Sequence, residues 1–246
     1  IDCGGRPAMA ASFERGGWGE GGGPGSLMGA IALLRQTLSD ARWYQEAKQS
    51  AERNQLEPPS RHDDLEALNE VVSGNQRMMF AVGDVKEAMR AKALANEMNL
   101  DLMILGNGDE YRDLDGAKSL NWIIVPVAFP DRPKLASIDA AIRVPLRTLQ
   151  IWEQSPTNLR RLNDAGVQTC VTTKDLGSPK EIRKALIDAT HAGLERSEAL
   201  AQITTHPARM LGISDTTGRI AVGNAAHLVI CDGDYFEDDT KIEETW

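Results

Sequence analysis

The chain has 246 residues, of which 41% are hydrophobic and 26% charged, and this composition is typical of a globular protein with a sizeable core. No apolar run approaches the roughly 20 residues that a membrane-spanning helix needs, and a net charge of −9 argues against a general nucleic-acid-binding surface. The three cysteines, Cys3, Cys170 and Cys231, form no close pair, so they support neither a disulfide framework nor a cysteine zinc site.

The first predicted elements are a loop and a long helix. Residues 1–25 are rich in glycine and show no period, which predicts a loop or a terminus left by a cut in the chain. A helix is predicted over residues 26–54, with Ser26 as its N-cap and Pro58 after its end. Its apolar face is given by residues at helical spacing: Leu27, Ile31, Leu34 and Leu38.

From Asp63 onward, short apolar strands alternate with helices. Strands are predicted over residues 78–82, 100–105, 122–127 and 167–172. Helices are predicted over residues 63–72, 109–120, 146–165 and 197–203, and after Asp84 and Ser178. Such apolar strands are expected where both faces of a parallel sheet are covered, and the alternation indicates βαβ units. A Rossmann-like sheet and part of a (β/α)8 barrel both fit this pattern.

The last segment predicts a small β element attached to the α/β body. Strands are expected over residues 218–223 and 227–230, followed by a turn at Asp232-Gly233-Asp234. The chain stops at Trp246, soon after what reads as an unfinished strand, and it begins at Ile1 without an initiator methionine. We therefore expect a fragment of a longer protein. Both cytoplasm and periplasm fit the sequence as its compartment.

The four histidines do not predict a metal site of their own. None forms a His-x-His or His-x-x-x-His pair, the spacings that bring two imidazoles to one metal ion. His62 is expected in solvent beside a helix start, His191 near a helix C-terminus, His206 in a turn before Pro207, and His227 in a short strand.

Polar residues that follow the predicted strands are better candidates, because ligands bind at the carboxyl ends of strands in α/β sheets and barrels. Asp175 is the best catalytic candidate, as a general base or a metal ligand, with a helix-start charge beside Ser178 as the alternative. Asp84 and Asp109 are interpreted as helix N-caps. The segment Gly106-Asn107-Gly108 reads as a turn, with an anion cradle at a helix N-terminus as the alternative.

The tail carries a family resemblance. The runs Ile203-Thr204-Thr205-His206-Pro207-Ala208-Arg209-Met210-Leu211-Gly212-Ile213, Gly218-Arg219-Ile220-Ala221-Val222-Gly223 and Leu228-Val229-Ile230-Cys231-Asp232-Gly233-Asp234 resemble the C-terminal signature of the amidohydrolase superfamily. The likeness is greatest to imidazolonepropionase-like and dihydroorotase-like members. The chain departs from the signature at His206, where asparagine is usual, at Asn224, where lysine is common, and at His227, where aspartate is common.

Other segments are similar to the same family. Pro24-Gly25-Ser26-Leu27-Met28-Gly29-Ala30 resembles a helix of large bacterial amidohydrolase-like proteins, and Val171-Thr172-Thr173-Lys174-Asp175-Leu176 resembles the final barrel strand. The resemblance implies an α/β fold: the C-terminal half of a distorted (β/α)8 TIM-type barrel plus part of a small β-sandwich. The implied organisation is a loop or cut terminus over 1–25, the partial barrel over 26–212, and part of the sandwich over 213–246.

The resemblance also implies a chemistry and a cofactor. Members hydrolyse carbon–nitrogen bonds with water activated by zinc or another divalent metal ion, held in part by histidines at two middle strand ends and an aspartate after the last strand. Here the corresponding strand ends read Phe80-Ala81-Val82 and Leu105-Gly106-Asn107 and hold no histidine, whereas Asp175 lies about one residue from the family register.

Two functional hypotheses follow from this mixture of matches and departures. The first is a metal-dependent hydrolase acting on amide or cyclic amide bonds of a small-molecule substrate. The second is a non-catalytic relative that has lost its metal ligands and binds a small molecule or serves in an assembly. A Rossmann-type nucleotide-binding protein is disfavoured, because no Gly-x-Gly-x-x-Gly follows a strand. The expected macromolecular partner is the missing N-terminal half of the barrel or a second copy of the chain, not nucleic acid or membrane.

Overall fold

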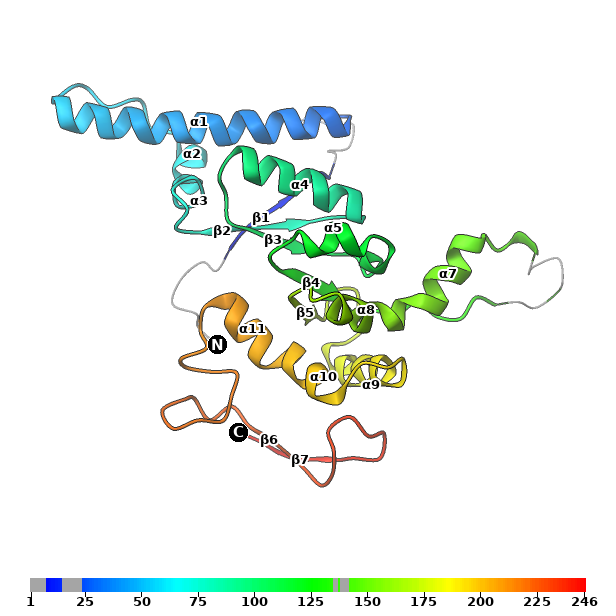
Figure 1. Cartoon of the computed structure of the whole chain (residues 1–246). Coiled ribbons are helices and arrows are strands. Elements are labelled where there is room, and N and C mark those ends of the chain that lie inside the picture. The colour runs from blue at the N-terminus through cyan, green and yellow to red at the C-terminus, as the bar shows by residue number, and fades with distance from the viewer. Residues whose placement is uncertain (1–7, 15–23, 135–136, 138–141) are drawn as a thin grey trace. The chain divides into compact units, whose positions relative to one another are not determined.

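The computed structural model describes residues 8–14, 24–134, 137 and 142–246. The chain forms two compact units, Ile1–Ile104 and Leu105–Trp246. Within the described ranges, no helix combines the length and the apolar character needed to cross a membrane. Figure 1 shows the elements along the chain.

Among its described residues, the first unit contains the parallel strands β1 and β2, most of strand β3 (Leu102–Leu105) and four helices. Strand β1 pairs with β2 in register from Ala8 opposite Arg77 to Ser12 opposite Ala81. The elements in chain order are β1 (Ala8–Ser12), α1 (Leu27–Asn54), α2 (Asp63–Ala67), α3 (Asn69–Val72), β2 (Arg77–Ala81) and α4 (Val85–Glu97). Strand β1 was not predicted, since it lies inside the segment 1–25 that was expected to be a loop. The remainder of that segment at 1–7 and 15–23 lies outside the described residues.

Helix α1 confirms the prediction for residues 26–54. The hydroxyl oxygen of Ser26 accepts a 3.1 Å hydrogen bond from the backbone N–H of Gly29, so Ser26 is the N-cap. The helix ends where Gln55 adopts a left-handed conformation with φ of 53°. Its buried face includes Leu38 and Tyr44, which are 2% and 1% exposed. Burial of this face, more than helix propensity, stabilises the helix.

The second unit continues the strand–helix alternation. Its elements are the end of β3 (Leu102–Leu105), 3-10 helix η1 (Glu110–Arg112), α5 (Leu114–Lys118), β4 (Ile123–Pro126), α7 (Leu146–Gln154), 3-10 helix η2 (Ser155–Thr157), α8 (Asn158–Asp164), β5 (Thr169–Thr172), 3-10 helix η3 (Pro179–Glu181), α9 (Ile182–His191), α10 (Arg196–Ile203), α11 (Thr205–Leu211), β6 (Val229–Cys231) and β7 (Ile242–Thr245). Strand β4 is buried along its whole length, as expected for a strand covered on both faces.

The strand order supports the barrel alternative. In the first unit the N–H of Met78 in β2 donates to the carbonyl of Asp101 just before β3, and in the second unit the N–H of Gly106 just after β3 donates to Ile124 in β4. With β4 parallel to β5, the five-stranded sheet has the sequential order β1-β2-β3-β4-β5. A Rossmann-type sheet reverses its strand order at a switch point, whereas a (β/α)8 barrel keeps sequential neighbours.

The C-terminal segment contains a two-stranded antiparallel sheet, β6 with β7. The expected strand over residues 218–223 is wrong, because this stretch is a turn region in which Gly218 and Gly223 have φ values of 92° and 93°. His206 also differs from its prediction, since it lies in the first turn of helix α11 instead of in a turn before Pro207. Pro207 stands near the helix start, where its missing N–H needs no partner.

Two arginines attach the loop between β6 and β7 to the helices. The guanidinium group of Arg183 in α9 donates to the carbonyl oxygens of Tyr235 at 2.8 Å, Glu237 at 2.6 Å and Thr240 at 2.8 Å. Arg196 in α10 forms ion pairs with Asp234 at 2.8 Å and Glu237 at 3.0 Å. These contacts hold the loop from two neighbouring helices.

Candidate active site at the strand ends of the second unit

The loops that follow β3 and β5 contain the polar residues that the sequence analysis singled out. The loop after β3 runs through Gly106, Asn107, Gly108, Asp109 and Glu110 into η1. Its counterpart after β5 runs through Asp175 to η3. Both begin at carboxyl ends of parallel strands, where α/β proteins bind ligands.

Glu110 is the centre of the first loop and is 4% exposed. Its Oε1 accepts hydrogen bonds from the backbone N–H groups of Asn107 at 2.8 Å and Gly108 at 3.1 Å. Its Oε2 accepts a 2.6 Å hydrogen bond from the side-chain amide of Asn158, at the start of α8. The Asn158 Oδ1 in turn accepts a 2.8 Å hydrogen bond from the N–H of Tyr111. A buried carboxylate with both oxygens occupied in this way holds the backbone of the loop.

The turn Gly106-Asn107-Gly108 therefore surrounds an anion, and the anion is the chain's own Glu110 carboxylate. A Cβ added to Gly106 would overlap Oε1 of Glu110 and would lie 2.9 Å from its Cδ. Gly108 has a φ of 91°, a conformation that favours glycine. The carboxyl end of β3 is thus closed by Glu110, and a side chain at position 106 has no room.

Asp109 differs from its neighbour in the way its oxygens are used. It is 5% exposed and occupies the N-cap position of η1, as predicted, but its side chain makes no capping hydrogen bond there. Its Oδ2 lies 3.4 Å from Arg112 and 3.8 Å from Arg147, while its Oδ1 has no hydrogen-bond partner among the described residues. The parallel prediction for Asp84 is confirmed, because its Oδ1 accepts a 2.8 Å hydrogen bond from the N–H of Glu87.

Asp175 follows β5 and points into solvent. Its side chain is 66% exposed, its Oδ2 lies 3.9 Å from Nζ of Lys174, and its backbone is left-handed with φ of 66°. Aspartate is among the few residue types besides glycine that adopt this conformation readily in loops. The capping interaction at the next helix is made by Ser178, whose hydroxyl oxygen accepts from the N–H of Lys180 at 3.3 Å. The catalytic role of Asp175 stays a prediction.

The histidines lie apart from these loops. His62, His191 and His227 are exposed. His206 is partly buried, and its Nδ1 lies 2.9 Å from the carbonyl oxygen of Thr169 at the start of β5 and 3.5 Å from Oε1 of Glu198. It therefore ties α11 to the amino end of β5, the end of the strand opposite to Asp175.

A metal ion does not fit the described residues by themselves. Across residues 8–14, 24–134, 137 and 142–246, no group of three or more His, Cys, Asp or Glu side chains is arranged to hold one. The Glu110 carboxylate is already saturated by backbone and amide donors, and Asp175 has Lys174 beside it.

Asn158 was not predicted as a site residue, because residues 146–165 were expected to form one helix. The structure divides that stretch into α7 and α8, with η2 (Ser155–Thr157) between them. Pro156 was the available signal, because proline disrupts the interior of a helix. The break places Asn158 at the start of α8, where it reaches Glu110.

Known proteins were compared with this chain by sequence and by fold. Residues 150–246 match the amidohydrolase family model, and no curated protein matches the sequence. The structure is similar to that of an amidohydrolase from Thermotoga maritima MSB8, with a TM-score of 0.78 and 18% identity over 98% of this chain and 61% of that chain. It is also similar to a prolidase complexed with N-methylphosphonate-L-proline, with a TM-score of 0.52 and 20% identity over 76% of this chain and 48% of that one.

These likenesses confirm the predicted fold class, a partial (β/α)8 barrel with a small antiparallel sheet. The chain spans 61% of the length of the Thermotoga protein. The sequence match lies where the C-terminal signature was recognised and includes β5, Asp175 and α11. Residues 150–246 of the chain therefore match the amidohydrolase family by sequence, and the fold agrees with that match.

Proposed function

We propose that the protein hydrolyses a carbon–nitrogen bond of an amide or cyclic amide and that Asp175 transfers the proton in this reaction. The supporting observation is that the family match includes Asp175 and that this residue lies in the loop after the carboxyl end of β5. Residues that act on substrates lie at this edge in (β/α)8 enzymes. The similarity to a prolidase adds Xaa-Pro dipeptides to the cyclic amides as substrates to test.

In this proposal the carboxylate of Asp175 is the group that transfers the proton. As a base it accepts a proton from the water whose oxygen attacks the carbonyl carbon of the substrate. As the carbon–nitrogen bond breaks, the same carboxyl group donates that proton to the departing nitrogen, and the carboxylate is restored. The 66% exposure of the side chain leaves it accessible to water and to a substrate.

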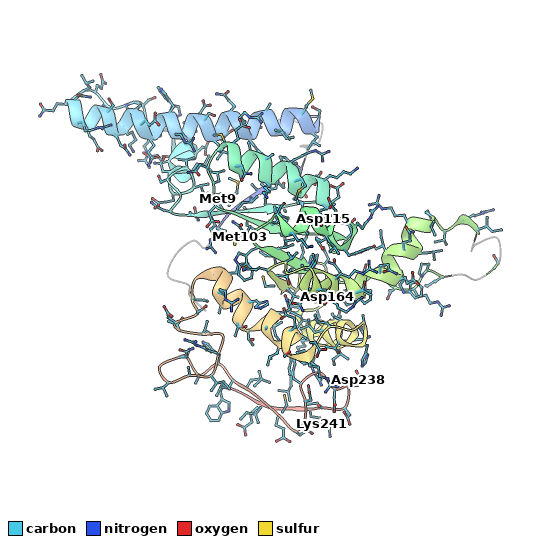
Figure 2. All side chains as sticks on the ribbon, in the orientation of Figure 1. Met9, Met103, Asp115, Asp164, Asp238 and Lys241 are labelled. Atoms are coloured by element: carbon cyan, nitrogen blue, oxygen red, sulfur yellow. The ribbon has the colours of Figure 1, made fainter. Side chains whose placement is uncertain are left out.

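The test is hydrolysis of a panel of cyclic amides and dipeptides by the full-length protein and by Asp175→Asn. The substitution removes the proton acceptor and keeps the size of the side chain, so kcat/KM is expected to fall by roughly 10²- to 10⁴-fold. Asp164→Asn is the matched control, because Asp164 lies in α8 with its side chain 59% exposed (Figure 2). Hydrolysis of no panel member would reject the proposed function, and full activity of Asp175→Asn would reject the role of Asp175.

One observation favours a second candidate, a non-catalytic homologue that binds a small molecule. The carboxyl end of β3 is filled by the Glu110 carboxylate, and no described group of side chains is arranged to hold a metal ion. Metal analysis of the full-length protein separates the two candidates. About one or two zinc ions per chain, lost together with activity in Asp175→Asn, would reject the non-catalytic candidate.

We also propose that the chain associates with a complementary half of the barrel or with a second copy. In the sheet formed by the described residues, β1 and β5 are the edge strands, and an edge strand presents backbone N–H and C=O groups with which another strand can pair. In the C-terminal segment, Ile220, Val222 and Trp246 are 90%, 107% and 71% exposed. Light scattering after gel filtration should therefore show a complex or aggregate of the isolated chain, and a monomer with a single cooperative melt would contradict this proposal.

A further inference from the structure

Asp109 is a buried carboxylate with one oxygen left without a donor. Three buried side-chain oxygens lack a hydrogen-bond partner among the described residues, and they belong to Asn69, Asp109 and Gln202. Only Asp109 is charged, and only Asp109 follows the carboxyl end of a strand of the parallel sheet. Leaving a buried charged acceptor unpaired is costly, so the folded protein must find a donor for this atom.

The loop itself does not supply that donor. The N–H groups of Asn107 and Gly108 are committed to Glu110, and the N–H of Tyr111 is committed to Asn158. The hydrogen bond between Glu110 and Asn158 holds the backbone of the loop next to Asp109. The adjacent carboxylates thus differ: Glu110 is saturated within the chain, and Asp109 keeps a free acceptor.

The charges around Asp109 indicate the chemistry of a ligand. Its free Oδ1 accepts a hydrogen bond, which an ammonium or amide N–H donates. Its Oδ2 contacts Arg112 and Arg147, and their guanidinium groups can receive a carboxylate on the same ligand. The Oδ1 atom is itself buried, whereas the side chains of these arginines are 46% and 64% exposed, so a ligand reaches Oδ1 by displacing the two arginine side chains.

We propose that Asp109 is a binding residue for small molecules that carry an ammonium or amide N–H, with Glu110 and Asn158 as the positioning residues that present it. Arg147 and Arg112 would hold a carboxylate where the ligand has one, as an amino acid or dipeptide does. This inference deepens the proposed function and rests on it for the choice of amide-bearing ligands. It assigns substrate binding to the loop after β3 and leaves proton transfer to Asp175.

The test is calorimetric titration of the full-length protein with glycinamide, which carries both an ammonium and an amide N–H. Glycinamide is expected to bind to the wild type and to Asp115→Asn, and to bind about 10- to 100-fold more weakly to Asp109→Asn. Asp115 is the matched control because it lies in α5, in the same connection between β3 and β4, and its side chain is fully exposed (Figure 2). N,N-dimethylacetamide, an amide of similar size without an N–H, is expected not to bind.

A second variant keeps the test decisive if Asp109→Asn does not fold. Arg147→Gln changes an exposed side chain. It is expected to weaken the binding of glycylglycine, which has a carboxylate, at least about tenfold more than the binding of glycinamide. Equal losses of affinity for the two probes, or no binding of glycinamide by the wild type, would overturn the inference. The hydrogen-bond donor to Oδ1 would then be an internal water molecule. Binding without hydrolysis of any amide would instead reject the proposed function and keep the binding site.

Discussion

The side-chain amide of Asn158 donates a 2.6 Å hydrogen bond to Oε2 of Glu110, across 48 residues of the chain. Both residues are almost completely buried, and each also holds a backbone N–H of the loop after β3. The pair joins the end of a strand to the start of a helix and sets the conformation of the loop between them.

Exchanging the donor and the acceptor of this pair gives a direct test. Glu110→Gln places an amide donor opposite the Asn158 amide, and Asn158→Asp places two carboxylates face to face, so each single change is expected to cost about 1–3 kcal/mol of unfolding free energy. The double variant restores one donor and one acceptor and should recover at least half of the summed loss. Urea denaturation of the wild type, the two single variants and the double variant measures these unfolding free energies. Additive losses would contradict the pairing.

Substitution of Gly106 by alanine should destabilise the protein although alanine is a small residue. The added Cβ would overlap the Glu110 carboxylate, which is buried and held by three hydrogen bonds, so relief requires breaking some of them. The expected cost is about 1–3 kcal/mol of unfolding free energy. Gly25→Ala serves as the control in the same denaturation experiment, because a Cβ at Gly25 meets nothing within 4 Å. An equal effect at both positions would count against the closed strand end.

The attachment of the loop between β6 and β7 should weaken in acid. The pKa of Asp234 is lowered from 3.8, first by the hydrogen bond from the N–H of Phe236 and then by Arg196. A lowered pKa in the folded state means that the stabilisation is fully present above pH 3.8 and is lost as the pH falls below it. Melting temperatures measured from pH 6 to about pH 2 should therefore fall more steeply for the wild type than for Asp234→Asn. Parallel curves would show that this carboxylate contributes nothing.

The two cysteines in the described part of the chain should react at different rates. Burial raises the pKa of the Cys170 thiol to about 12, so little thiolate forms at pH 8, whereas Cys231 is only half-buried. Iodoacetamide at pH 8 should label Cys231 in the native protein and Cys170 only after denaturation, as read by peptide mass spectrometry. Rapid native labelling of Cys170 would indicate that β5 opens locally.

Local signals in the sequence predicted much of the fold. The Ser26 cap, the 3.6-residue period of α1 and the short apolar runs at β2, β3, β4 and β5 are properties of neighbouring residues, so they are visible without a structure. Strand β1 was missed because the sequence Ala-Met-Ala-Ala-Ser has no alternating pattern and owes its conformation to pairing with β2. The expected strand at 218–223 failed because two glycines with positive φ turn the chain there.

The site could be predicted only in part, because its contacts join distant segments. The positions of Asp109 and Asp175 after strands could be predicted, because the end of a strand is visible in the local sequence. The use of Glu110 as an internal anion depends on Asn158, and no pattern within the loop contains that information. Asp109 was interpreted as a cap from its place before a helix, whereas tertiary packing turned its side chain inward and away from the helix N–H groups.

Gly218 also determines how the sequence can vary. A Cβ at this position would lie 2.5 Å from Cβ of Ala208 and 3.0 Å from the carbonyl oxygen of Thr204, both in the segment that forms and precedes α11. Side chains at positions 208 and 218 would thus occupy the same space. A smaller residue at position 208 would still not allow a side chain at position 218, because the positive φ of Gly218 favours glycine. Related chains that keep this turn should therefore carry small residues at both positions, and the two positions should not vary independently.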